Sequence, residues 1–194
     1  MYYEELKNSD GILIKGPLLI KPKVHSDERG YFFESWNQAC FNEIINKNIN
    51  FKQDNQSFSR SGVLRGLHYQ LKPYIQGKLV KVVAGKIFDV IVDLRMSSST
   101  FSNWLGIVID DVNNHQLWVP EGFAHGFLTL SNTAVVQYKV TNYWSSNHEV
   151  TLNWNDSCIN IDWPESNLEN KLLISNKDKM GKSLQELLDC NLIF

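Results

Sequence analysis

Between residues 51 and 143 the chain alternates short runs of β-branched and aromatic residues with turns, and this pattern most restricts the folds open to it. The runs KLVKVV and KIFDVIVDL flank Ala84-Gly85, which predicts a hairpin. WLGIVI, HQLWV, FLTL and AVVQYKVT follow, with turns at residues 110–114 and 131–133. Many short strands at such spacing are typical of an antiparallel sandwich or barrel, so we expect an all-β fold of the jelly-roll type.

Two strand-like segments lie nearer the N-terminus. Residues 11–24, GILIKGPLLIKPKV, are apolar but contain Gly16, Pro17 and Pro22. Proline donates no hydrogen bond to a sheet, so this segment is predicted to be an edge strand. A polar turn over residues 25–30 precedes YFFESW, which alternates and is rich in aromatic residues, as strands are.

Helices are expected only outside this run of strands. QACFNEIIN, residues 38–46, would place Phe41, Ile44 and Ile45 on one helical face. Near the C-terminus, SLQELLDC begins with Ser183 and Glu186 in the spacing of a capping box. We find no internal repeat, low-complexity tract or linker, so we expect one domain over residues 1–194 with a few short peripheral helices.

The composition restricts the possible partners. A net charge of −2 over 194 residues argues against a broad basic surface, so no nucleic-acid partner is expected. No apolar run approaches the roughly 20 residues that span a bilayer, so no membrane is expected either. The first residues carry acids and lack the apolar core of a secretory signal, and the three cysteines lack metal-ligand spacing. These features predict a cytoplasmic protein with reduced thiols.

The stretch SFSRSGVLRGLHYQ, residues 57–70, carries the first indication of function. On a regular strand Arg65 and His68 would point to opposite faces, but a bulge at Gly66 would turn both to the same side. A cation and a titratable base that converge inside a sheet are costly unless they have partners, which favours a ligand. The alternative is an edge strand with a solvated arginine and a hydrogen-bonded structural histidine.

Other titratable residues also interrupt apolar runs, and each has an ordinary explanation. His125 would be a core histidine bonded to a backbone carbonyl, and Tyr138 a core residue with its hydroxyl at the edge. Lys78 would extend its ammonium to water, and Asp178 would be solvated in a polar loop. If they instead meet His68 in one barrel mouth, they form a set suited to proton transfer.

Metal binding is a competing use of two histidines. Three well-placed nitrogen or oxygen ligands are not evident around His68 or in residues 115–127, so no metal is expected. We also find no GxGxxG, P-loop or GxSxG motif, which leaves nucleotide-cofactor, ATP and serine-hydrolase chemistry unsupported.

Seven segments resemble one family in the same order along most of the chain. They are DERGYFFE (27–34), QDNQSFSRSGVLRGLHYQ (53–70), QGKLVKVVAGKIFDVIVDLR (76–95), STFSNWLG (99–106), HQLWVPEGFAHGFLTLS (115–131), YKVTNYW (138–144) and SNKD (175–178). Together they closely resemble the dTDP-4-dehydrorhamnose 3,5-epimerase family. The resemblance implies a metal-free, cofactor-free cupin-type jelly roll, usually a homodimer that exchanges N-terminal strands, acting on dTDP-4-dehydro-6-deoxy-D-glucose.

The resemblance also implies roles for individual residues. His68 resembles the general base beside the C4 ketone, Asp178 its orienting partner, and Tyr138 the acid on the opposite face. Lys78 and His125 resemble groups that hold the sugar and its enolate oxygen. Arg29 and Arg65 resemble diphosphate-binding arginines. Other positions that match nucleotide or sugar contacts are Glu34, Gln53, Asn55, Glu149 and Lys177.

Two departures from the family pattern accompany the resemblance. Trp144 stands where a tyrosine commonly stacks on thymine, and a longer segment, ESNLENKLLI, precedes SNKD. Four alternatives remain: an epimerase of C3 or C5 alone, a 3,4-ketoisomerase, a sugar-nucleotide-binding module without turnover, and a metal-dependent cupin oxygenase.

Overall fold

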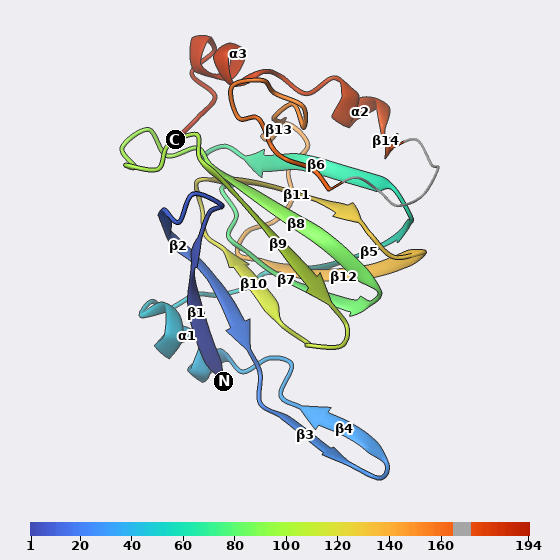
Figure 1. The fold of residues 1–194 in the computed structure, drawn as a ribbon. Helices are drawn as coiled ribbons and strands as arrows, with labels where there is room; N and C mark the ends of the chain where they lie inside the picture. Colours follow the sequence, from blue (N-terminus) through green and yellow to red (C-terminus); the bar gives the residue numbers. More distant parts are fainter. Residues whose placement is uncertain (165–171) are drawn as a thin grey trace.

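Two antiparallel β-sheets packed face to face form the body of the protein, seen in a computed structural model (Figure 1). The structure describes residues 1–164 and 172–194; part of the predicted segment ESNLENKLLI therefore lies outside the described residues. The strands are β1 (Tyr2–Lys7), β2 (Leu13–Lys21), β3 (Val24–Asp27), β4 (Gly30–Phe33), β5 (Gln53–Arg60), β6 (Val63–Gln70), β7 (Lys78–Ala84), β8 (Lys86–Asp93), β9 (Trp104–Asp110), β10 (Gln116–Val119), β11 (Phe123–Thr129), β12 (Thr133–Val140), β13 (Glu149–Thr151) and β14 (Leu173–Ile174).

The strand order is that of a jelly roll. The first sheet has the order β1-β2-β10-β7-β12-β5, and the second has the order β13-β6-β11-β8-β9. All of these neighbours are antiparallel, whereas the short β14 pairs with β6 in parallel. The predicted all-β antiparallel jelly roll is confirmed.

A hydrophobic core fills part of the space between the sheets. Val80 and Val82 of β7 pack there with Ile87 and Ile91 of β8, all at most 4% exposed. Each such side chain contributes roughly 1.5–3 kcal/mol through burial. Tyr138 packs at the border of this cluster, where the apolar filling gives way to polar side chains.

The predicted hairpin at Ala84-Gly85 is wrong. β7 pairs with β10 and β12 in the first sheet, whereas β8 pairs with β9 and β11 in the second. Gly85 has a φ of +86°, and its N–H and C=O bond to Asp111 rather than across a hairpin. A Cβ at Gly85 would lie 2.1 Å from the carbonyl oxygen of Thr133. The turn therefore carries the chain from one sheet to the other.

The predicted edge strand over residues 11–24 is also corrected. β2 lies between β1 and β10, and the unpredicted strand β1 forms the edge. Only Leu18–Ile20 pair with β10, so Pro17 lies outside that ladder. The pairing of β2 with β1 shifts register between Glu5 and Lys7, beside Gly16-Pro17. An interior strand accommodates the proline because the proline sits at this irregularity.

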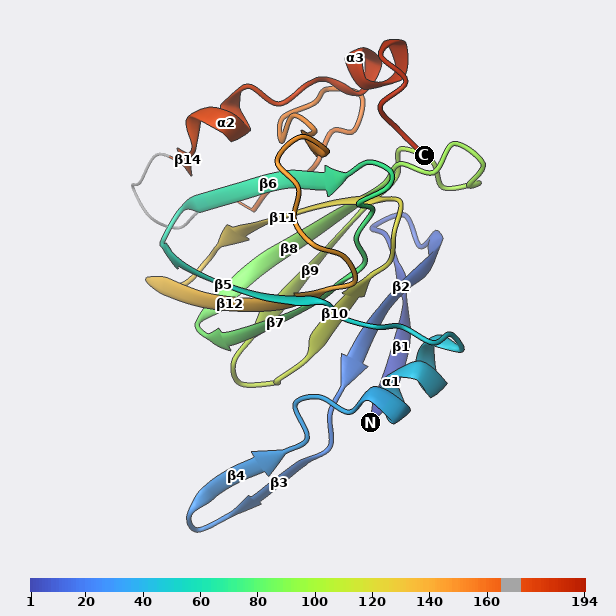
Figure 2. The ribbon, with the colours of Figure 1, turned by 180° about the vertical axis from the view of Figure 1, so that it is seen from behind.

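The hairpin of β3 and β4 projects away from the body in both views (Figures 1 and 2), and we call it the arm. The strand predicted over YFFESW is confirmed as far as Phe33. Tyr31 and Phe32 at its tip are 62% and 73% exposed. The arm thus presents aromatic side chains that the body of the same chain does not cover.

Short helices lie outside the sheets, as expected. Helix α1 (Gln38–Ile45) packs Phe41 against Trp118, with ring centroids 5.3 Å apart. Helix α3 (Leu184–Asp189) begins with the predicted Ser183–Glu186 capping box. Helix α2 (Asn176–Lys179) is a single turn where a loop was expected, and α2 and α3 lie over the β6 side of the body (Figure 1). No helix in the described part of the chain is long and apolar enough to span a bilayer.

Candidate active site

A bulge in β6 brings Arg65 and His68 to the same cavity. His68 pairs with His125 of β11, and Arg65 pairs with Phe127, so two residues on β6 stand opposite Gly126 alone. Gly66 has a φ of +116°, and a Cβ there would lie 2.7 Å from the Cα of Gly126. Only glycine permits this close approach of two strands. The predicted bulge and its effect on the two side chains are confirmed.

The cavity lies between the two sheets and has two lobes. The larger lobe has a volume of about 570 Å³ and the smaller about 330 Å³. Both lobes are bordered by His68, Lys78, Tyr138 and Glu149. Arg65, His125, Lys177 and Asp178 line only the larger lobe, whereas Gln53, Asn55 and Trp144 line only the smaller. The structure thus brings together eleven of the thirteen residues singled out in the sequence.

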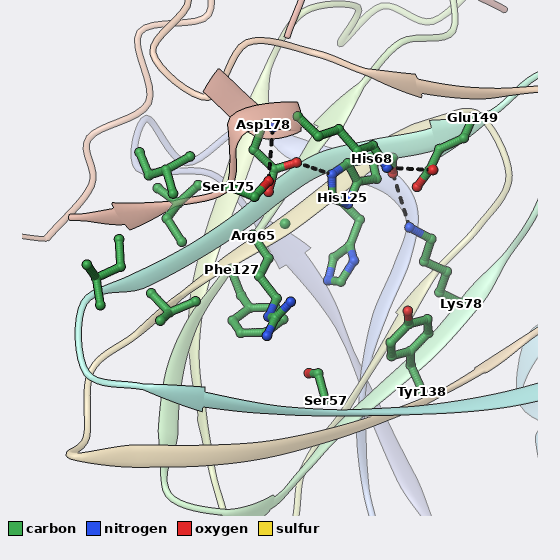
Figure 3. A pocket seen from close by; sticks show the side chains of 16 residues that line it. Ser57, Arg65, His68, Lys78, His125, Phe127, Tyr138, Glu149, Ser175 and Asp178 are labelled. Carbon is green, nitrogen blue, oxygen red and sulfur yellow. Dashed lines mark hydrogen bonds and ion pairs between the residues drawn. The ribbon is translucent and has the colours of Figure 1, made fainter. Parts of the chain in front are cut away.

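His68 is held from behind by a buried carboxylate. Its Nε2 lies 2.6 Å from Oδ1 of Asp178, which is 4% exposed rather than solvated as in its ordinary explanation (Figure 3). Burial alone would raise the pKa of Asp178, but the hydrogen bond and charge of His68 outweigh it, with help from the Gly66 N–H and Ser175. The carboxylate therefore stays ionised and accepts the Nε2 proton, which leaves Nδ1 of His68 as the free basic nitrogen.

Lys78 does not extend its ammonium to bulk water. It is 8% exposed, and its Nζ donates to the carbonyl oxygen of His68 at 3.1 Å. Burial lowers the pKa of Lys78 to about 8, although the charges of Glu149 and Asp89 oppose the shift. A partly desolvated ammonium beside the base is placed to stabilise negative charge that develops in the cavity.

Tyr138 faces the cavity from the opposite sheet. It lies on β12, whereas His68 lies on β6, and their side chains approach from opposite walls (Figure 3). Burial raises the pKa of Tyr138, and the charge of Glu149 raises it further, so the phenol remains protonated at neutral pH. A base and an acid therefore stand on opposite sides of one cavity.

His125 pairs with a carboxylate instead of a backbone carbonyl. Its Nε2 lies 2.9 Å from Oδ1 of Asp89, which is fully buried on β8. Burial lowers the pKa of His125 despite this partner, so the ring is neutral and Nδ1 is its acceptor. Each histidine of the cavity thus has one carboxylate partner. Within residues 1–164 and 172–194, no three His, Cys, Asp or Glu side chains gather in a way that could hold a metal ion.

The smaller lobe is bordered by an aromatic side chain with fixed neighbours. Trp144 is 56% exposed, and its indole N–H donates to Oε2 of Glu149 at 3.2 Å. The same oxygen accepts from Nζ of Lys177 at 2.5 Å. Gln53 Oε1 accepts the backbone N–H of Trp144 at 3.0 Å, and Gln53 Nε2 donates to Asn55 at 2.8 Å.

Arg29 and Glu34 are the two singled-out residues that do not line the cavity. Arg29 lies at the turn of the arm, where its side chain is 90% exposed and pairs with Asp27 at 2.6 Å. Glu34 follows the arm and accepts from Asn37 at 3.0 Å. Within one chain, neither carries its charge to the cavity.

The structure adds residues that sequence reasoning missed. Asp89 interrupts the otherwise apolar KIFDVIVDL, and a carboxylate in a buried strand needs a partner, which was the available signal. Ser57 and Ser59 continue the period-two polar pattern that begins at Gln53 and points inward along β5. Ser59 accepts from Nε of Arg65 at 3.0 Å and so orients that guanidinium.

Comparison with known proteins identifies the family of this site. A family model described as dTDP-4-dehydrorhamnose 3,5-epimerase matches residues 12–186. The chain belongs to the dTDP-4-dehydrorhamnose 3,5-epimerase family. A member from Shigella flexneri is 52% identical over 85% of this chain and 89% of its own length. Another, from Pseudomonas aeruginosa, is 46% identical over 92% of this chain and 96% of its own.

Solved structures agree with the cupin-type jelly roll. A dTDP-6-deoxy-D-glucose-3,5-epimerase from Legionella pneumophila, crystallised with dTDP-4-keto-L-rhamnose, has a TM-score of 0.88 and 41% identity, covering 99% of this chain and 97% of its own. A 3'-monoepimerase from Streptomyces bikiniensis, solved with dTDP-quinovose, has a TM-score of 0.85 and 29% identity, covering 93% and 89%. The fold is therefore common to epimerases that act on two carbons and to those that act on one. The sequence identity of this chain is higher to the 3,5-epimerase than to the 3'-monoepimerase.

Proposed function

We propose that this chain is a dTDP-4-dehydrorhamnose 3,5-epimerase, which inverts C3 and C5 of dTDP-4-dehydro-6-deoxy-D-glucose. The observation that carries the proposal is the pair His68 and Tyr138, a base and an acid on opposite walls of one cavity. Inversion needs proton removal from one face of a carbon and proton return to the other, and this arrangement supplies both. In this proposal residues 1–194 form one epimerase domain.

The chemistry follows from the ketone at C4, which makes the hydrogens on both C3 and C5 acidic. His68 Nδ1 takes the proton, and the electron pair of the broken C–H bond forms an enolate with its charge on the C4 oxygen. The ammonium of Lys78 stabilises that charge. Tyr138 then gives its proton to the opposite face of the carbon, and solvent restores both groups. One enolate site serves both carbons if the sugar ring turns between the two steps.

The nucleotide provides the binding energy that positions the sugar. Trp144 offers a face for the thymine ring, with Gln53, Asn55, Glu149 and Lys177 around it. We assign the diphosphate to Arg65. Ser59 and the carbonyl oxygen of Phe58 orient its guanidinium in the larger lobe, which supports this assignment. Binding energy from this remote part of the substrate holds the reacting carbons between His68 and Tyr138.

The functional unit in this proposal is a homodimer whose arms are exchanged. The arm presents Tyr31, Phe32 and Arg29 to solvent, and β5 is an open edge of its sheet beside the cavity. An exposed aromatic hairpin and an open strand edge are surfaces that partners cover. A second copy would bring Arg29 and Glu34 to the cavity that lacks them. We place the enzyme in the cytoplasm, in keeping with its three free cysteines, all within the described residues.

Solvent exchange tests the function directly. We would incubate dTDP-4-dehydro-6-deoxy-D-glucose with the protein in heavy water and follow deuterium at C3 and C5 by proton NMR. The proposal expects label at both carbons, and L-rhamnose nucleotide after addition of a 4-ketoreductase. Label at one carbon would instead identify a one-site epimerase, the second candidate, which the shared fold of the 3'-monoepimerase supports. Binding of dTDP without any label would indicate a module that lacks turnover.

A further inference from the structure

Trp144 is fixed at two points although more than half of it is exposed. Its backbone N–H donates to Oε1 of Gln53 at 3.0 Å, and its indole N–H donates to Oε2 of Glu149 at 3.2 Å. Neighbouring Tyr143 is similarly exposed, at 58% against 56%, but no hydrogen bond joins its ring to Glu149. The ring of Trp144 therefore has a set plane, and its second attachment leads into the catalytic cavity.

Oε2 of Glu149 connects three separate segments. It accepts from the Trp144 indole after β12 and from Nζ of Lys177 on α2, while Glu149 itself begins β13. Lys177 is followed directly by Asp178, whose Oδ1 lies 2.6 Å from Nε2 of His68. A chain of contacts thus runs from the exposed indole to the carboxylate that holds the base.

Helix α2 is held by β14, which lies directly before it and pairs with β6, and by these side-chain contacts. It spans only Asn176–Lys179, and a single turn does not hold itself in water. Two adjacent side chains fasten it to the barrel, Lys177 to Glu149 and Asp178 to His68. Because Lys177 and Asp178 are adjacent, the contact of Lys177 with Glu149 lies directly beside the contact of Asp178 with His68.

We propose that Trp144 is a positioning residue, whose indole N–H acts through Glu149 and Lys177 to hold α2 and so keep Asp178 against His68. A base stacked on the ring adds a contact to the indole, and the same chain of contacts carries the effect to Asp178 and His68. Binding of the nucleobase is thereby coupled to the position of Asp178 against His68. This inference rests on the proposed function, in which Trp144 contacts the nucleobase.

The substitution Trp144→Phe separates positioning from stacking, because phenylalanine keeps an aromatic face and lacks the N–H. We expect kcat for exchange at C3 to fall about tenfold, while the Kd for dTDP changes by less than about threefold. Tyr143→Phe, on the neighbouring exposed aromatic, is the matched control and leaves both values unchanged. A loss of dTDP affinity with wild-type kcat would reduce Trp144 to a stacking surface and overturn the inference.

A double-mutant cycle tests the path through Glu149. Glu149→Ala removes the shared carboxylate, so adding Trp144→Phe to it should cost less than about twofold more in kcat. If the two losses in kcat multiply instead, the indole does not act through Glu149. The ¹⁵N signals of the His68 ring give a readout without turnover: dTDP should shift them in the wild-type protein and not in Trp144→Phe. Absence of exchange by the wild-type protein would reject the proposed function, whereas equal dTDP-induced shifts in both proteins would reject this coupling.

Discussion

His68 and Asp178 lie 110 positions apart in the sequence and meet at 2.6 Å. Each alone has a structural explanation, and their chemistry arises from the contact, which fixes the tautomer of the imidazole. The proposed role of Tyr138 arises in the same way, because burial and Glu149 keep its phenol protonated across the cavity from His68. The residues of the cavity thus derive their function from their neighbours more than from their type.

Tyr138→Phe should separate proton exchange from inversion. His68 can still remove a proton and return it to the same face, so we expect deuterium exchange to fall less than tenfold while inversion falls about 10²-fold or more. Proton NMR in heavy water measures exchange, and a coupled reductase measures the inverted product. Tyr3→Phe, on exposed β1, is the control. Inversion at the wild-type rate in Tyr138→Phe would show that another group is the acid.

The pKa of Lys78 predicts how kcat changes at alkaline pH. Its pKa is lowered to about 8, so the ammonium that stabilises the enolate in our proposal is present below this pH and lost above it. The pKa of Tyr138 is raised, so the phenol stays protonated through the same range. We expect kcat to fall as pH rises through about 8, by about tenfold per pH unit beyond it. Lys78→Arg keeps its charge, and in that variant the decline should move to higher pH; an unchanged decline would assign it to another group.

Two short segments position the proposed catalytic pair. The bulge in β6 turns His68 inward, and the single turn of α2 delivers Asp178 to it. The side chain of Ser175 caps α2 by accepting the backbone N–H of Asp178 at 3.1 Å. This cap sits directly at the contact of Asp178 with His68, whereas the Ser183 cap of α3 does not line the cavity.

Ser175→Ala and Ser183→Ala form a matched pair of cap removals. Each removes an N-cap bond worth about 1 kcal/mol, so both should lower the free energy of unfolding by a similar amount. Only Ser175→Ala should also reduce kcat, by roughly fivefold, because it loosens Asp178 beside His68. Denaturant unfolding and exchange kinetics measure the two effects. Equal kcat values in the two variants would mean that the cap does not position the base.

The sequence predicted elements well where local signals decide them. The capping box of α3, the helix around Phe41 and the bulge at Gly66 each depend on nearby residues, and all three are confirmed. The hairpin at Gly85 failed because a glycine turn looks the same whether the next strand stays in the sheet or crosses to the other. The residues alone left Asp178 open between solvent and the cavity, because a polar segment such as SNKD looks solvated until the pairing of the preceding β14 with β6 is known.

Residues from both sheets and from the C-terminal segment line the cavity. In the proposed dimer, the arm of a second chain also contributes to it. Pairings between strands that are far apart in the sequence determine which strands face each other across the cavity. No local sequence pattern specifies these pairings. The identities of eleven cavity residues nevertheless followed from the family resemblance. The part played by Asp89 did not follow from the resemblance, because only the pairing of β8 with β11 brings Asp89 to its partner His125.

Mixing two inactive variants tests the proposed exchange of arms. Arg29→Ala damages the arm, and His68→Ala damages the cavity of its own chain. In mixed dimers one cavity has both residues intact, so equal mixing after dissociation should restore about a quarter of wild-type activity. His68→Ala mixed with Asp178→Ala is the control, because both changes affect the body and no intact cavity forms. If the first mixture also stays inactive while dimers form, Arg29 does not act across the dimer.

The turn at Gly85, which passes the chain from one sheet to the other, also bears on how the protein is made. From β5 to β8, and again from β9 to β13, successive strands belong to alternate sheets, and β12 completes the wall that carries Tyr138. A ribosome that has released the first half of the chain has therefore exposed strands of both layers, and neither layer can close. Such long-range pairing makes folding slow and leaves strand edges open. We therefore expect folding to await nearly full synthesis of the chain.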